Sequence, residues 1–255
     1  MTCTPPIETV PRSPVLGPRP ARLTIVDRHL LFAESIAAAL ESEGYLVHRL
    51  DLREPTSSLA ATLGRALRAA PRIVLLEPDL GEIGDGTRLV APLAARGAAV
   101  IVVTGSRERA RWGEWLRHGA HAVVSKSCTL DEMTRTVRRV RDGLPAMPAP
   151  VREALIEEAL NDRAEVHEIR ARLERLTHRE RDILAALMTG TQVRDIARAH
   201  VVSEATVRTQ VKSILSKLQM RSQLAAVGAA YRASWGPLVE KSAGITSDRI
   251  GELAG

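Results

Sequence analysis

The chain has 255 residues, a length that favours two domains, and 45% of its residues are hydrophobic, enough to build buried cores. Its net charge of +6 suits a polyanionic partner. The two cysteines, Cys3 and Cys128, have neither metal-site nor disulfide spacing, and the longest apolar runs are far too short to span a bilayer. Because no secretory signal is apparent either, we expect a cytoplasmic protein without membrane contact.

The first twenty residues predict a disordered tail. Six prolines in residues 1–20 block helices and sheet interiors. They are Pro5, Pro6, Pro11, Pro14, Pro18 and Pro20. We therefore expect folded structure to begin near residue 21.

Residues 21–143 alternate short apolar runs with helical stretches. The predicted strands are Leu23–Val26, Leu46–Leu50, Ile73–Leu76, Ala99–Val103 and Ala122–Val124. The predicted helices are His29–Glu43, Ser57–Ala69, Thr87–Arg96, Arg107–His118 and Leu130–Arg141. This alternation predicts right-handed βαβ units and a doubly wound (βα)5 domain with a parallel sheet. Functional residues are expected at the carboxyl ends of the strands.

Residues 144–172 predict a linker followed by a helix. Leu144–Pro150 contains three prolines, and Val151–Leu176 has helical character. Apolar residues from Leu155 to Leu176 recur alternately four and three positions apart, which is the spacing of a coiled coil. Asp162 interrupts this seam, so an amphipathic helix that packs on a domain is an equal alternative.

Residues 173–235 predict an all-α domain. Thr177 and Glu180 have the spacing of a capping box, which starts a helix that Gly190 can end. A second helix is predicted near Val193–Ala199, and Ser203 can cap a third one from Glu204 to about Leu218. Residues 236–255 are predicted to form a C-terminal tail.

The positive charge is concentrated in this second domain. Between Arg170 and Trp235 the sequence has twelve Lys or Arg and only five Asp or Glu, so this stretch holds the whole positive excess of the chain. The third predicted helix has an apolar back that includes Val207, Val211 and Ile214. Its other faces are polar and basic, as a helix that enters the major groove of DNA requires.

Three segments carry a resemblance to a known family: Leu176–Leu184, Asp195–Ala197 and Val202–Leu218. They resemble the LuxR-type helix-turn-helix of the NarL/FixJ response regulators. The resemblance implies that Arg208, Thr209 and Lys212 face bases and nearby phosphates. It also implies contacts to the DNA backbone from Ser203, Thr206 and Lys217, and a dimer made through the final helix, residues 222–235. His200, Gln192 and Val193 depart from the family pattern.

The first domain resembles a response-regulator receiver. Asp27, Thr104 and Lys126 stand at positions where that family keeps an acidic residue, a hydroxyl and a lysine. Arg28 replaces its second Mg²⁺-binding carboxylate, and Glu77 replaces the Asp that accepts phosphate. Val123 also stands where the family has a mobile Tyr or Phe.

These departures predict a receiver that is not controlled by ordinary Asp phosphorylation. Because a guanidinium supplies no oxygen ligand for Mg²⁺, we predict no metal and no other cofactor. Instead, Arg28 is expected to bridge Asp27 and Glu77 in the place of the cation, with Lys126 facing Glu77. The alternatives are that Arg28 points to solvent, or that Asp79 accepts the phosphate.

The sequence as a whole predicts a DNA-binding transcription regulator that works as a homodimer on double-stranded DNA. In the alternative, the receiver captures a protein partner or a small ligand, and DNA binding is secondary. An enzyme is not expected, because the sequence has no phosphate-cradling Gly-rich motif, no metal-spaced His/Cys cluster and no nucleophile elbow.

Overall fold

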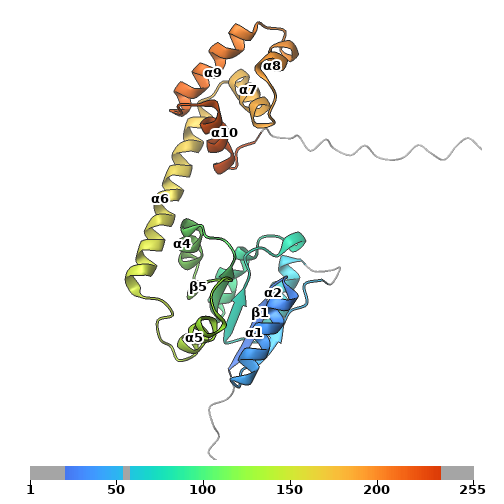
Figure 1. Ribbon diagram of the computed structural model, residues 1–255, viewed down its shortest axis with the longest axis vertical. Coiled ribbons are helices and arrows are strands. Elements are labelled where there is room, and N and C mark those ends of the chain that lie inside the picture. The colour runs from blue at the N-terminus through green and yellow to red at the C-terminus, as the bar shows by residue number, and fades with distance from the viewer. Residues whose placement is uncertain (1–20, 54–57, 237–255) are drawn as a thin grey trace, which may run out of the picture. The chain divides into compact units, whose positions relative to one another are not determined.

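The computed structural model of the chain describes residues 21–53 and 58–236 (Figure 1). The predicted tail 1–20 and nearly all of the predicted tail 236–255 lie outside these ranges. The chain divides between Ala159 and Leu160 into two compact units, and each is treated separately below. In the described ranges, no helix combines the length and the apolar character that crossing a bilayer requires.

The first unit is built on a five-stranded parallel sheet with the strand order β2-β1-β3-β4-β5, which confirms the predicted doubly wound fold. Its strands are β1 (Arg22–Val26), β2 (Leu46–Arg49), β3 (Ile73–Leu76), β4 (Ala99–Thr104) and β5 (Ala122–Ser125). The central strand β3 is buried throughout, because helices cover both of its faces. Its neighbour β1 is buried beyond Arg22 for the same reason.

Helices on the two faces of this sheet enclose two apolar cores. The helices are α1 (Leu30–Ser42), α2 (Leu59–Arg68), α3 (Val90–Ala95), α4 (Arg109–Arg117) and α5 (Leu130–Arg141). Residues of α1 and α5 pack with Leu23 and Ile25 of β1, and residues of α2, α3 and α4 pack with Val26 on the other face. The predicted helix Thr87–Arg96 is divided in the structure, because the 3-10 turn η2 (Gly86–Leu89) precedes α3.

Helix α6 (Ala149–Glu174) contributes to both units, and its contacts bear on the two interpretations of the heptad spacing. Leu155 and Ala159 are buried in the first unit, whereas Ile169 and Leu173 are buried in the second. The apolar positions at both ends of the seam are therefore covered within one chain, whereas Val166 in the middle is only half-buried. These contacts favour the amphipathic helix that packs on a domain, and the coiled coil between two chains stays a prediction.

The close approach of α6 to α4 depends on Gly113. A Cβ atom placed on Gly113 would lie 1.8 Å from the carbonyl oxygen of Leu155. Arg152 strengthens the contact, since its guanidinium donates to the carbonyl oxygen of Leu116 in the last turn of α4 and to those of Ala120 and His121 beyond its end. The first half of α6 is therefore an integral part of the first unit.

The second unit is helical, as predicted. It contains α7 (His178–Met188), α8 (Val193–Ala199), α9 (Glu204–Leu218) and α10 (Gln223–Arg232), around a core that includes Ile183, Leu184 and Ile214. The predicted capping box is formed: the Thr177 side chain accepts from the amide of Glu180, and the Glu180 carboxylate accepts from the amide of Thr177. Ser203 caps α9 by accepting from the amide of Thr206.

Candidate functional site

The carboxyl edge of the parallel sheet gathers four of the predicted receiver residues. Asp27 follows β1, Glu77 follows β3, Thr104 ends β4 and Lys126 follows β5. The backbone holds them in register, because the Glu77 amide donates to the carbonyl of Val26 and the Lys126 amide donates to the carbonyl of Thr104. All of these strands are parallel, so the four residues meet at one edge of the sheet.

Lys126 lies between the two carboxylates. Its ammonium nitrogen is 2.7 Å from Oε1 of Glu77 and 2.8 Å from Oδ2 of Asp27. The side chains of Glu77 and Asp27 are only 6% and 3% exposed. The same ammonium lies 4.9 Å from the centre of the Phe32 ring. A buried cation thus neutralises part of the negative charge of the pocket.

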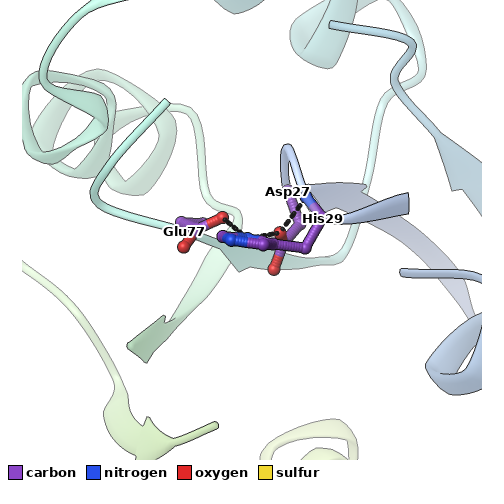
Figure 2. Close-up of side chains that lie close together, drawn as sticks. All are labelled: Asp27, His29 and Glu77. Carbon is purple, nitrogen blue, oxygen red and sulfur yellow. Dashed lines mark hydrogen bonds and ion pairs between the residues drawn. The ribbon is translucent and has the colours of Figure 1, made fainter. Parts of the chain in front are cut away.

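His29 completes this pocket, and the sequence analysis did not include it. Figure 2 shows its ring lying between Glu77 and Asp27. Its Nδ1 atom is 2.8 Å from Oε2 of Glu77, 3.1 Å from Oδ1 of Asp27 and 2.9 Å from the ammonium of Lys126. The only signal in the sequence is its position two residues after Asp27, where a turn can return a side chain toward the strand end. The backbone amide of His29 also donates to Asp27.

The two carboxyl groups respond to this environment in opposite directions. Burial, followed by the hydrogen bond with Asp27, raises the pKa of Glu77. Burial alone would raise the pKa of Asp27 too, but hydrogen bonds from Glu77, Lys126 and the His29 amide hold it below its usual value. Of the two, Glu77 therefore takes up a proton more readily and can donate it to the carboxylate of Asp27.

Arg28 does not bridge the two carboxylates, and that expectation was wrong. Its guanidinium instead lies 2.8 Å from Oδ2 of Asp79, and these side chains are 44% and 68% exposed. The physical reason is that Lys126 and His29 already occupy the space between Asp27 and Glu77. Asp79 also accepts from the Gly81 amide, so it is held outside the buried cluster.

Thr104 is buried, and its hydroxyl hydrogen-bonds to the loop after β4 rather than to the other residues of the pocket. Its hydroxyl oxygen accepts from the backbone amide of Ser106, and the carbonyl of Ser106 accepts from the indole of Trp112 in α4. Thr104 therefore supports the loop that leads into α4. Val123 is buried in the core on the same side of the sheet as α4. This position therefore has no aromatic ring that could move as the Tyr or Phe of other receivers does.

The donor atoms of this pocket can be tested against Mg²⁺, the ion that a receiver fold implies. One atom each from Asp27, His29 and Glu77 lie within 4.8 Å of one another. Mg²⁺ requires several hard oxygen ligands, whereas this set has one imidazole nitrogen and lacks the second carboxylate at residue 28. The ammonium of Lys126 also lies at ion-pair distance from both carboxylates. The residues therefore do not fit Mg²⁺.

The predicted DNA-reading residues lie along the exposed side of α9. Lys212 is exposed, and its ammonium makes no hydrogen bond or ion pair within residues 21–53 and 58–236. Arg208 is exposed and pairs with Glu204 one turn earlier, at 3.2 Å. Thr209 is exposed, although its hydroxyl donates to the carbonyl of Ala205. This face therefore presents two exposed cations on a helix whose other face is anchored in the core.

Ser203 and Thr206 lie at the amino end of α9. Their hydroxyl oxygens are 2.8 Å apart, and Ser203 also accepts from the Thr206 amide at 3.0 Å. Both residues are exposed. The amino end of a helix carries partial positive charge and suits a phosphate, so their placement is compatible with the predicted contacts to the DNA backbone.

Lys217 is engaged inside the domain, contrary to the expectation of a contact to the DNA backbone. Its ammonium lies 2.6 Å from Oε2 of Glu180, which is buried, and the Ser213 hydroxyl donates to the other oxygen of Glu180 at 2.7 Å. Burial would raise the pKa of Glu180, but hydrogen bonds from Lys217, Ser213 and Thr177 lower it to about 2. Glu180 therefore stays ionised and joins α7 to α9.

The departures from the family pattern have local consequences. His200 is half-buried, and its ring nitrogen and carbonyl oxygen both accept from Arg179, so a polar contact replaces the aliphatic packing. Gln192 precedes α8 but makes no side-chain capping hydrogen bond. In α10, Leu224 is 81% exposed, a large apolar side chain at the position where the resemblance implies a dimer contact.

The helical unit matches a known protein family. Residues 174–230 match the family described as "Bacterial regulatory proteins, luxR family". This range includes α7, α8 and α9 entirely.

The similarity to individual proteins extends over both units. The chain is 23% identical over 207 residues to a nitrate/nitrite response regulator protein homolog of Haemophilus influenzae, covering 80% of this chain and 93% of that protein. It is 25% identical over 208 residues to the transcriptional regulatory protein LnrK of Bacillus subtilis, covering 79% and 92%. Among solved structures, the RcsB response regulator of Salmonella typhimurium is 19% identical, with a TM-score of 0.47 and coverage of 84% and 98%. The second unit therefore matches the luxR family of bacterial regulatory proteins, and most of the chain, with its receiver-like unit followed by a helix-turn-helix unit, is similar to response regulators.

Proposed function

We propose that this protein is a sequence-specific transcription regulator whose receiver works without phosphorylation of an Asp at the end of β3. A role in DNA binding is supported by the LuxR-family match over residues 174–230 and by relatives that are transcription regulators. Independence from phosphorylation is supported by one observation: Glu77 takes the place of the phosphate acceptor and is buried against Lys126 and His29.

The chemistry of the pocket supports this proposal in two ways. The lysine that would bind phosphoryl oxygens in a receiver is already paired with both Asp27 and Glu77. The donor set also has an imidazole nitrogen and no carboxylate at residue 28, so it supplies fewer oxygen ligands than Mg²⁺ needs. Mg²⁺ assists phosphoryl transfer by neutralising the developing charge. The Glu77 carboxylate carries about one negative charge against up to about two for a phosphorylated residue, so it imitates the phosphorylated state only in part.

For DNA binding, the proposal assigns base contacts to Arg208, Thr209 and Lys212 on α9, with Ser203 and Thr206 at phosphates. Their exposure and the basic character of this face support that assignment. The protein acts as a homodimer that places two recognition helices on a two-fold operator, and the exposed Leu224 supports an interface on α10. No catalytic activity is proposed.

The decisive experiment is to incubate the full chain with Mg²⁺ and acetyl phosphate, and separately with Mg²⁺ and beryllofluoride. We expect no phosphoryl adduct by intact-mass measurement, no rise in melting temperature and no change in affinity for a DNA fragment selected by gel shift. The matched variant, Arg28→Asp with Glu77→Asp, supplies the carboxylate missing at residue 28 and an Asp in place of Glu77, and it should become sensitive to Mg²⁺.

A stable phosphoryl adduct on the parent protein would contradict the proposal. Peptide mapping of that adduct then tests the alternative acceptor, Asp79. Because Asp79 is 68% exposed and paired with Arg28, its modification would be expected to release Arg28 rather than to change the buried cluster.

A further inference from the structure

A second cavity lies at the opposite edge of the receiver sheet from Asp27. Its volume is about 510 Å³, and its lining includes the first residues of β1 and β2, Arg22 and Leu46, together with the last turn of α2. That volume falls within the usual range for small-molecule sites. None of the residues that line it takes part in the pocket formed by Asp27, His29, Glu77 and Lys126.

The cavity is strongly cationic. Arg22, Arg65, Arg68 and His48 line it, and no carboxylate is among the described residues that do so. Arg65 donates to the carbonyl oxygen of Asp51, which fixes one guanidinium at the rim. Over residues 21–53 and 58–236, the side chains of Arg22, Arg68 and His48 make no hydrogen bond or ion pair. Among the described residues, the guanidinium groups of Arg22 and Arg68 thus line the cavity without an internal counter-charge.

A buried hydroxyl in the same lining lacks a partner. Thr24 of β1 is 1% exposed, and its Oγ1 atom has no hydrogen bond within the described residues. Buried polar atoms without a partner cost free energy and are uncommon in folded proteins. A ligand with an oxygen acceptor in the cavity would satisfy this hydroxyl. Thr62 of α2 is similarly buried and unpaired but does not line the cavity.

The rest of the lining is apolar. Leu46 remains 54% exposed although it lies in a strand, and Ala69, which follows α2, is half-buried in the same lining. A fully hydrated ion such as inorganic phosphate would leave these side chains without a contact. An apolar group attached to the anion would cover them and gain from their burial.

We propose that this cavity binds a small amphiphilic organic anion. Its acidic head group contacts Arg22 and Arg68 and accepts a hydrogen bond from Thr24, while its apolar body lies against Leu46 and Ala69. The site is independent of phosphorylation and of DNA contact. It would give this receiver a chemical input at the amino edge of its sheet.

The test uses three probes on the full-length protein. Octanoate has the head group and the apolar body, 1-octanol has the body without the charge, and inorganic phosphate has the charge without the body. Calorimetric titration should detect saturable binding of octanoate, at least about tenfold tighter than that of either other probe. Methyl NMR should show shifts at Leu46 and Ala69 and none at Leu80, which lies beside the other pocket.

Two pairs of variants identify the site. Arg22→Gln with Arg68→Gln should weaken octanoate binding at least about tenfold, whereas Arg88→Gln with Arg96→Gln, which removes the same charge from exposed positions elsewhere, should not. Thr24→Val should raise the melting temperature of the free protein and weaken octanoate binding. Thr62→Val should also raise the melting temperature and leave binding unchanged.

Three results would overturn the proposal. The first is octanoate binding that survives the loss of Arg22 and Arg68. The second is binding of inorganic phosphate or 1-octanol as tight as that of octanoate. The third is methyl shifts that map away from Leu46 and Ala69.

Discussion

Each domain of this protein buries one glutamate against one lysine, and the two pairs behave differently. Glu77 lies 2.7 Å from Lys126 in the receiver, and Glu180 lies 2.6 Å from Lys217 in the helix-turn-helix domain. Both glutamates are almost fully buried. Yet the pKa of Glu77 is raised, whereas that of Glu180 is lowered to about 2.

The difference comes from what else surrounds each carboxylate. Glu180 accepts from the Ser213 hydroxyl and from the amide and hydroxyl of Thr177 in addition to Lys217. Glu77 shares its lysine with a second carboxylate, Asp27. A buried carboxylate that is surrounded by hydrogen-bond donors stays ionised and holds its partners in place. A carboxylate that shares its counter-ion with a second carboxylate is protonated more readily. The same residue pair thus serves stability in one domain and can serve a switch in the other.

The largest expected effect is on the buried ion pair of Glu180 with Lys217. Glu180→Ala removes the capping box and leaves Lys217 and Ser213 without their acceptor, so the free energy of unfolding of the helical domain should fall by about 3 kcal/mol. Urea unfolding of the full chain at neutral pH measures this change. Glu168→Ala, on an exposed pair with Arg172, should cost at most about 0.5 kcal/mol. Equal effects of the two variants would contradict the proposed role of Glu180.

The lowered pKa of Glu180 also determines how the stability of the helical domain depends on acid pH. Because its pKa is lowered in the folded state, its contribution is complete above the ordinary value of 4.5 and is lost as the pH falls toward about 2. In the Glu180→Ala variant, this part of the acid dependence should be absent.

The next effect concerns the exposed cations of the helical domain, which have no buried partner. Lys212→Ala and Arg208→Ala should each weaken binding to a selected operator fragment by about 1–3 kcal/mol. Arg96→Ala in the receiver is the control for lost charge. Lys217→Ala should lower stability through Glu180 and leave the salt dependence of binding unchanged. A reduced salt slope with unchanged stability would instead restore Lys217 as a contact to the DNA backbone.

Two glycines in helices, Gly113 and Gly228, allow the packing around a helix to be compared between the two domains. Gly113→Ala in α4 would force its new methyl group into the Leu155 carbonyl, so it should lower stability by about 1–3 kcal/mol. Hydrogen exchange should increase across residues 149–159 in that variant. Gly228 in α10 has no atom within 4 Å of the equivalent position, so Gly228→Ala should raise stability by about 0.5–1 kcal/mol. Unchanged stability of Gly113→Ala would contradict the contact between α4 and α6.

The smallest expected effect is at Glu77. Glu77→Gln should change the free energy of unfolding by less than about 1 kcal/mol at neutral pH, because Lys126 keeps Asp27 as its counter-ion. Asp27→Asn should cost more, since the pKa of Asp27 is lowered and its charge stabilises the fold above the ordinary Asp range.

The pH profile separates these two variants. A raised pKa means that Glu77 favours the folded state when protonated, so its contribution falls as the pH rises from 4.5 through its folded pKa. Thermal melts of Glu77→Gln from pH 4 to 8 should lack that decline, and a parallel profile to the parent would contradict the assignment.

The sequence determined the order and kind of nearly all elements. Continuous apolar runs predicted the strands, and α5, α8 and α9 span the predicted residues because Thr129, Gln192 and Ser203 precede helical periodicity directly. The meeting of Asp27, Glu77, Thr104 and Lys126 at one edge was also predictable, because parallel strands place their carboxyl ends together.

Only the tertiary structure decided which charges pair. Arg28 lies beside Asp27 in the sequence but turns to Asp79, and His29 takes the inner position because the turn after β1 directs its ring toward Glu77. Lys217 shares a helix with Lys212, yet the packing of α9 on α7 directs it to Glu180. The heptad spacing of α6 likewise could not reveal that its two ends enter different cores. Local pattern specifies backbone conformation, whereas the partner of a long charged side chain depends on distant segments that packing brings together.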